Sequence, residues 1–127
     1  MRYLLDTHTL LWYFDDSPDL PALVAEMIES FNVQKYVSVA SLWEFTIKRS
    51  LGKLDFEGGV ERFWKMVVSN RFNVLHITES YLRELEKLSF LHRDPFDRLL
   101  IATAITENMT ILTADNSIRQ YDVMWTW

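Results

Sequence analysis

The sequence predicts an α/β domain in which a mostly parallel sheet of four to five strands is flanked by helices. Short apolar runs alternate with longer amphipathic runs along the chain. This alternation is typical of β-α units, because a parallel strand needs a crossover, usually a helix, before the next strand. Aspartates also follow the first and the last of the clear apolar runs, and ligands of α/β sheets bind beyond the ends of such strands.

The composition supports one domain spanning residues 1–127. Nearly half the residues are apolar, and 3 Gly and 3 Pro are too few for a disordered or low-complexity chain. The absence of cysteine excludes disulfides, zinc–thiolate sites and thiol nucleophiles. The first apolar stretch is too short for a signal peptide or a membrane span, so we expect a soluble, cytoplasmic protein that does not contact a membrane.

The first quarter of the chain predicts one strand and two helices. Residues 3–5 are an uninterrupted apolar run, as in a buried strand, and residues 7–14 carry the apolar side chains of a short helix. Pro18 interrupts the pattern. Asp19 and Pro21 then restart a helix that continues to residue 28, with apolar residues at helical spacing.

The middle of the chain predicts a strand followed by two helices. Residues 36–39 form the second apolar run, and Ser38 or Ser41 is a candidate N-cap for a helix that ends near residue 51. The pair Gly58-Gly59 breaks the chain before a helix whose apolar face includes residues 60–67.

The last third predicts further strands separated by helices. Residues 74–77 form a third strand, and a helix with regularly spaced apolar residues begins at Thr78. Pro95 occupies the favoured first position of a helix that runs to about residue 108. The remaining expected elements are a fourth strand at 110–113, a helical turn at 116–121 and an edge strand at 123–125.

Acidic residues recur at the ends of apolar strands or early in apolar helices. They are Asp6, Glu44, Asp94, Asp97 and Asp115. If the first and fourth strands are neighbours, Asp6 and Asp115 converge, and two close carboxylates need a cation or a proton between them. Oxygen ligands without cysteine and with only 3 His indicate Mg²⁺ or Mn²⁺.

Each acidic residue also has a purely structural interpretation. Asp6, Asp94 and Asp115 stand where helix N-caps or Asx-turns form, and Asp97 is placed to complete a capping box. Glu44 is placed for an i,i+4 pair with Lys48. Because Asp97 opens an almost wholly apolar helix, it is a better candidate metal ligand than Asp94, which precedes the proline.

Four segments together resemble the successive motifs of PIN-domain proteins, most closely the VapC-type toxins of bacterial toxin–antitoxin pairs. The segments are residues 3–12 (YLLDTHTLLW), 41–44 (SLWE), 92–102 (HRDPFDRLLIA) and 112–115 (LTAD). They span nearly the whole chain in order, and their combination is specific although each motif alone is common.

This resemblance implies a three-layer PIN-like sandwich and a Mg²⁺- or Mn²⁺-dependent ribonuclease. The family's catalytic and metal-binding quartet falls on Asp6, Glu44, Asp97 and Asp115. Asp94 and Thr113 are then expected to support these ligands without binding the metal themselves. The implied partners are an RNA substrate, a cognate antitoxin and a second copy of the chain in a homodimer.

Other functions fit less well. Haloacid dehalogenase-type phosphatases need an acid two residues after the first aspartate, where this chain has His8, and response regulators need an aspartate after the third strand. A non-catalytic PIN-like module that binds RNA or protein is the alternative, although such a module has no need for four mutually repelling carboxylates. The spacing of His8, His76 and His92 does not indicate a metal site, so we expect them to cap or to pack.

The net charge of −5 argues against a general nucleic-acid binder, because phosphate contacts require basic side chains. Basic residues near the acidic ones could bind phosphate locally, although ordinary solvated helix faces would carry the same residues. They are Lys48, Arg49, Lys53, Arg93 and Arg98. For the antitoxin we expect an apolar groove near Glu44 and Asp6, although the spacing of Leu10 and Ile47 fits the core equally well. The expected lining is Leu10, Trp12, Trp43, Ile47 and Leu51.

Overall fold

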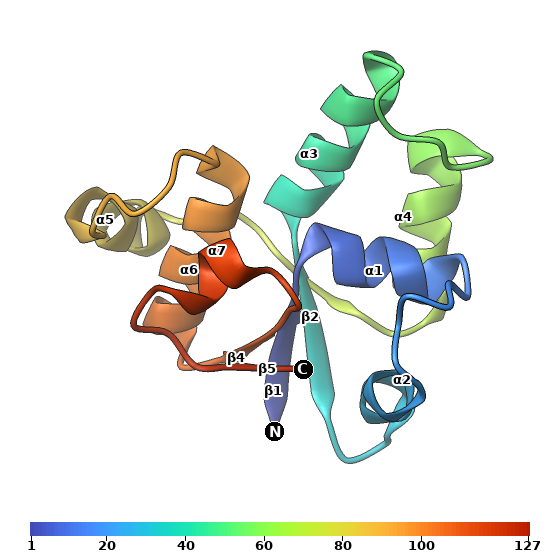
Figure 1. Ribbon diagram of the computed structural model, residues 1–127, viewed down its shortest axis with the longest axis horizontal. Coiled ribbons are helices and arrows are strands. Elements are labelled where there is room, and N and C mark those ends of the chain that lie inside the picture. Colours follow the sequence, from blue (N-terminus) through green and yellow to red (C-terminus); the bar gives the residue numbers. More distant parts are fainter.

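A computed structural model describes residues 1–127 and contains a five-stranded sheet in which every neighbouring pair is parallel (Figure 1). The strand order is β3-β2-β1-β4-β5. The strands are β1 (Arg2–Leu5), β2 (Gln34–Ser38), β3 (Asn73–Leu75), β4 (Thr110–Leu112) and β5 (Trp125–Thr126). The expected fold class is confirmed.

The centre of the sheet is a topological switch point. From β1 the chain adds β2 and β3 on one side, and then returns to add β4 and β5 on the other. Leu5 at the end of β1 pairs with Leu112 at the end of β4. The expected neighbouring of these two strands is therefore confirmed, and the residues that follow them share the edge where ligands of such sheets bind.

Helices cover both faces of the sheet and make three layers. They are α1 (Thr7–Phe14), α2 (Ala22–Glu29), α3 (Val39–Ser50), α4 (Gly59–Ser69), α5 (Glu79–Lys87), α6 (Pro95–Glu107) and α7 (Asn116–Arg119). In Figure 1, α1, α2 and α4 lie to the right of the sheet, and α5, α6 and α7 lie to its left. No helix has the length and apolar character needed to cross a bilayer.

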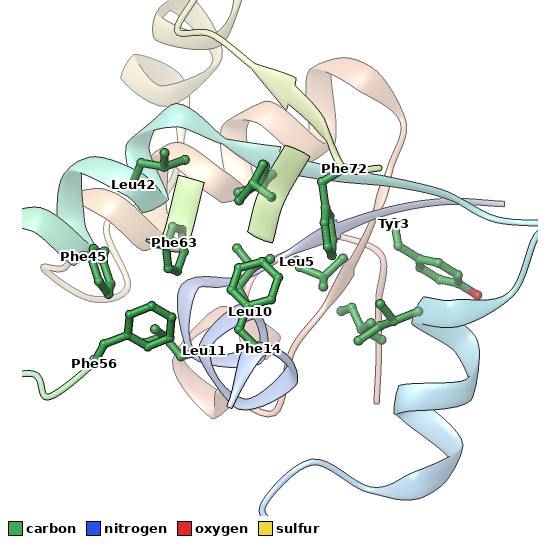
Figure 2. Close-up of a cluster of buried hydrophobic side chains, with 14 of the residues drawn as sticks. Tyr3, Leu5, Leu10, Leu11, Phe14, Leu42, Phe45, Phe56, Phe63 and Phe72 are labelled. Carbon is green, nitrogen blue, oxygen red and sulfur yellow. The ribbon is translucent and has the colours of Figure 1, made fainter. Parts of the chain in front are cut away.

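The sheet divides the hydrophobic core because neighbouring strand residues point to opposite faces. Tyr3 and Leu5 of β1 join a large cluster with the helices of one face, whereas Leu4 joins a smaller cluster with α6 on the other. Figure 2 shows the larger cluster, which is rich in phenylalanine. The rings of Phe45 and Phe63 stack there at a centroid distance of 4.5 Å.

Several expected boundaries move by a few residues. The second helix begins at Ala22, with Pro21 as its N-cap, and β2 begins at Gln34 because this residue pairs with Arg2. The edge strand is Trp125–Thr126 in place of 123–125, since Trp125 pairs with Ile111. The two strand shifts follow from strand pairing, which local sequence patterns do not contain.

The expected antitoxin groove is partly wrong. Leu10 has no exposed surface and belongs to the large core cluster, so it cannot line a groove. Trp12 and Ile47 are half-buried, whereas Trp43 and Leu51 are exposed. Only these four residues remain available for a contact.

Candidate metal centre

Asp6 lies at the centre of the sheet edge, where Thr9 and Thr113 each donate a hydrogen bond to its carboxylate. It directly follows β1 and caps α1, because its Oδ1 accepts a 2.8 Å hydrogen bond from the Thr9 amide. Its Oδ2 accepts a hydrogen bond from the Thr113 hydroxyl. Burial raises the pKa of Asp6 above its usual range, although the hydrogen bonds from Thr113 and Thr9 and the nearby His8 act in the opposite direction.

Asp115 follows β4 and stands beside Asp6. It caps α7 through a 2.8 Å hydrogen bond from the Ser117 amide to Oδ1. The Thr113 hydroxyl accepts from the Asp115 amide at 3.0 Å while it donates to Asp6, so Thr113 links the two aspartates. One cavity of about 190 Å³ is lined by Asp6, His8, Thr9, Trp12, Ala114 and Asp115.

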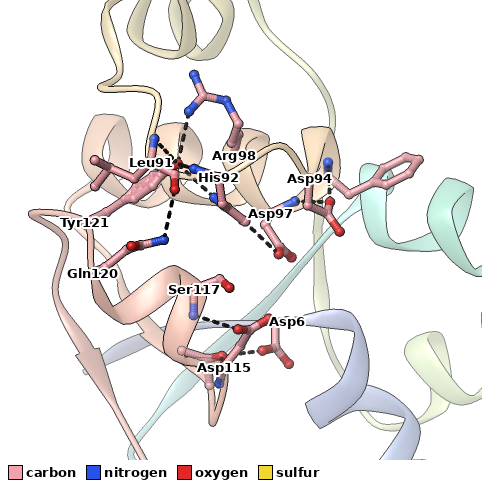
Figure 3. Close-up of polar contacts among 12 residues, drawn as sticks. Asp6, Leu91, His92, Asp94, Asp97, Arg98, Asp115, Ser117, Gln120 and Tyr121 are labelled. Atoms are coloured by element: carbon pink, nitrogen blue, oxygen red, sulfur yellow. Dashed lines mark hydrogen bonds and ion pairs between the residues drawn. The ribbon is translucent and has the colours of Figure 1, made fainter.

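Asp94 and Asp97 divide two tasks at the start of α6. Asp94 is the N-cap, because its Oδ1 accepts from the amides of Phe96 at 2.9 Å and Asp97 at 3.0 Å. Asp97 caps nothing, and its Oδ2 lies 3.1 Å from Nε2 of His92. In Figure 3 the Asp97 carboxylate points toward the part of the site that holds Asp6 and Asp115.

Glu44 reaches the same edge from α3 and is 3% exposed. Its Oε1 accepts a 2.6 Å hydrogen bond from the Thr7 hydroxyl, and its Oε2 lies 2.7 Å from Nζ of Lys48. The i,i+4 pair expected from the sequence therefore exists, but its acidic member is buried and is not part of a solvated helix face.

The negative charges of the neighbouring carboxylates raise the pKa values of Asp97 and Lys48. Burial raises the pKa of Asp97 to about 7, helped by the charges of Asp94, Asp115 and Glu44, while the hydrogen bond with His92 opposes the shift. Burial lowers the pKa of Lys48, but its hydrogen bond to Glu44 and the charges of Glu44, Asp94 and Asp97 outweigh this effect and raise it. Acidic residues from separate segments therefore act on one another at this edge.

The donor chemistry fits a hard divalent cation. Every acidic side chain in the centre offers carboxylate oxygens, which Mg²⁺ and Mn²⁺ prefer. No three acidic or histidine side chains are arranged as a complete ligand set, however. Asp6, Glu44 and Asp115 are each oriented by a hydroxyl, ammonium or amide donor, and each carboxylate retains free lone pairs.

Several residues of the site are not evident from the sequence. His92 packs edge-on against the ring of Tyr121, as expected, but it also contacts Asp97. Thr7 contacts Glu44. Arg98, expected among the available basic residues, is buried and donates to the Ser89 carbonyl at 2.9 Å. It is therefore not free to bind phosphate. The only sequence signal for His92 is its place just before the Asp94 cap.

Comparison with protein-family models identifies the family of this chain. The PIN domain model matches residues 3–124. The chain belongs to the PIN-domain family. No curated protein sequence matches it.

The fold of this PIN domain recurs in solved toxin–antitoxin structures. It resembles a chain of Rickettsia felis VapBC2 bound to promoter DNA, with a TM-score of 0.77, 18% identity, and coverage of 100% of this chain and 99% of that one. For a chain of VapBC-1 from nontypeable Haemophilus influenzae the TM-score is 0.73 and the identity 21%, with coverage of 99% of this chain and 97% of that one. For a chain of a toxin–antitoxin complex from Klebsiella pneumoniae the TM-score is 0.60 and the identity 18%, with coverage of 89% of this chain and 86% of that one.

Proposed function

We propose that this PIN domain is a Mg²⁺- or Mn²⁺-dependent endoribonuclease and the toxin of a toxin–antitoxin pair. The observation that carries the proposal is the meeting of carboxylates from separate segments at the switch point of the sheet. Asp6 and Asp115 follow neighbouring strands, while Asp97 and Glu44 come from helices. The fold shared with chains of VapBC complexes supports the toxin assignment.

Asp6, Glu44, Asp97 and Asp115 would hold the cation. When bound, it neutralises charge on the scissile phosphate and lowers the pKa of a water molecule. The hydroxyl of Thr113 orients both aspartates, because it donates to the Asp6 carboxylate and accepts from the backbone amide of Asp115. Asp6, Asp97 and Asp115 lie at capped helix starts, and the carboxylate of Glu44 is held by Thr7 and Lys48. The scaffold therefore fixes the positions of the carboxylates before any ligand binds.

The direct test is RNA cleavage by the purified protein. Cleavage should require Mg²⁺ or Mn²⁺, stop with EDTA and return when the metal is restored. Asp6→Asn keeps the shape of the side chain and the acceptor of the Thr9 cap, but removes the charge and the acceptor of the Thr113 hydroxyl. It should therefore lower cleavage by orders of magnitude in a folded protein. Chelator-resistant cleavage contradicts the mechanism, and metal-dependent RNA binding without cleavage favours a non-catalytic module.

A further inference from the structure

The hydroxyl of Tyr121 is the centre of a buried hydrogen-bond network next to Asp97 (Figure 3). Three N–H groups lie around its Oη: the Leu91 amide at 3.2 Å, the His92 amide at 3.1 Å and Nη1 of Arg98 at 3.0 Å. The imidazole Nδ1 of His92 lies closest, at 2.8 Å. Both Tyr121 and Arg98 are buried, and Arg98 is also fixed by the carbonyl of Ser89.

Counting donors and acceptors assigns the proton of each group. A backbone amide and a guanidinium can only donate, so three of the four neighbours of the Tyr121 hydroxyl cannot accept its proton. The remaining neighbour, Nδ1 of His92, must therefore be the acceptor. An imidazole that accepts at Nδ1 carries its proton on Nε2, and this nitrogen lies 3.1 Å from Oδ2 of Asp97.

We propose that His92 is a positioning residue that aims Asp97 at the metal. Tyr121 and Arg98 fix the Nε2–H tautomer of His92, whose N–H donates to Asp97 Oδ2 and leaves Oδ1 for the cation. The inference rests on the proposed metal site. Carboxylates that bind metals are commonly held by such outer hydrogen bonds, because the bond restricts the rotamer and orients the free oxygen.

The same accounting excludes His92 as a ligand. Its Nδ1 accepts from Tyr121 and its Nε2 carries a hydrogen, so neither nitrogen has a free lone pair for a cation. His92 therefore acts through Asp97 and not on the metal. A glutamine at position 92 should keep this action, since its amide nitrogen reaches about as far as Nε2 and also donates.

The tautomer is tested by ¹⁵N NMR of the metal-free protein above neutral pH. His92 should show an acceptor-type Nδ1 and a protonated Nε2, whereas the exposed His8 and His76 should show the averaged signals of mixed tautomers. Tyr121→Phe removes the donor to Nδ1 and should shift His92 toward such a mixture. A protonated Nδ1 on His92 in the wild-type protein overturns the proposal.

The positioning role is tested by Mn²⁺ affinity, measured by electron paramagnetic resonance. His92→Ala should weaken binding by about 10- to 100-fold, as loss of an outer hydrogen bond to a metal ligand typically does. His92→Gln should stay close to wild type, and the matched control His76→Ala should have no effect. In an Asp97→Asn background, His92→Ala should cause no further loss, because its effect passes through Asp97.

These readouts separate the inference from the nuclease function. A protein that binds Mn²⁺ with this order of affinities but leaves RNA intact supports the inference and contradicts the proposed activity. Wild-type protein without Mn²⁺ affinity overturns the inference, as does equal affinity of wild type and His92→Ala. If His92→Ala fails to fold, His92→Gln and Tyr121→Phe decide: Gln must retain affinity, and Phe must lose part of it.

Discussion

The ammonium of Lys48 lies 2.7 Å from the carboxylate of Glu44 at the edge of the proposed metal site. Glu44 is 3% exposed, whereas Lys48 keeps about a third of its side chain in solvent, at 35%. The pair therefore places a positive charge among carboxylates that repel one another. A bound divalent cation would neutralise the same charges.

Lys48→Met should destabilise the metal-free protein by about 1–3 kcal/mol, because it leaves Glu44 as a buried carboxylate without its cation. Mn²⁺ should stabilise this variant more than the wild type, since the metal replaces the missing charge. The measurement is the free energy of unfolding by denaturant, with and without Mn²⁺.

A matched control is the exposed i,i+4 pair on α4. Lys65 lies 3.3 Å from Glu61, and the two side chains are 74% and 80% exposed. Lys65→Met should change stability by at most about 1 kcal/mol, because solvent screens such pairs. Equal effects of the two substitutions would show that Glu44 does not behave as a buried charge.

Asp94 and Asp97 should respond to substitution in opposite ways. Asp94→Ala removes the cap from the amides of Phe96 and Asp97 and should cost about 0.5–2 kcal/mol of stability. Asp97→Asn removes a charge that its neighbours repel, so metal-free stability should hold or rise while cleavage falls by orders of magnitude. Denaturation and cleavage per folded molecule give the comparison. An unfolded Asp97→Asn variant with surviving activity would instead assign Asp97 to capping.

Metal-free stability should depend on pH through Asp97. Its folded pKa of about 7 lies above its ordinary value of 3.8, so the native state binds more protons between these values than the unfolded state does. Its contribution to stability is then present at low pH and is lost as the pH rises toward 7 and beyond. Relative to Asp97→Asn, the wild type should lose stability from about pH 4 to about pH 7. A constant difference across this range contradicts the raised pKa.

Short-range patterns predict the strands and five acidic candidates, and the resemblance to PIN domains selects the quartet from these five. The run that ends at Asp6 and the Asp94-Pro95 helix start can each be recognised within a few residues. The link between Tyr121 and His92 joins residues 29 positions apart in the chain, and no local pattern predicts it. The burial of Leu10 could not be predicted from the sequence either, because its helical spacing fits both a core position and a groove position.

A homodimer is expected from the apolar surface that the core leaves uncovered. Eight large apolar side chains are more than half exposed: Met1, Leu23, Phe31, Trp43, Leu51, Val68, Phe90 and Met124. Exposed apolar residues in this number favour association when they share a face. Sedimentation at micromolar concentration should show a dimer, and a monomer throughout this range would contradict the expectation.

The antitoxin is expected to approach the metal site along two adjoining cavities. The small cavity at Asp6 and Asp115 shares His8 and Trp12 with a larger one of about 550 Å³. An apolar segment could pack against Trp12 while a basic side chain reaches the carboxylates and competes with the cation for the same charge. If the gene beside this one encodes a small antitoxin, co-expression of its product should rescue growth and block metal-dependent cleavage.

Substitutions at two tryptophans and one leucine distinguish a docking surface from core. Trp43 is 58% exposed and Trp12 is half-buried, so Trp43→Ala and Trp12→Ala should leave the domain folded but weaken antitoxin binding. Leu10→Ala creates a cavity in the core and should cost about 2–5 kcal/mol of stability. Thermal unfolding and titration of each variant with the antitoxin provide the two measurements. If Trp12→Ala unfolds the domain as Leu10→Ala does, and Trp43→Ala binds the antitoxin like wild type, these side chains belong to the fold and the antitoxin binds elsewhere.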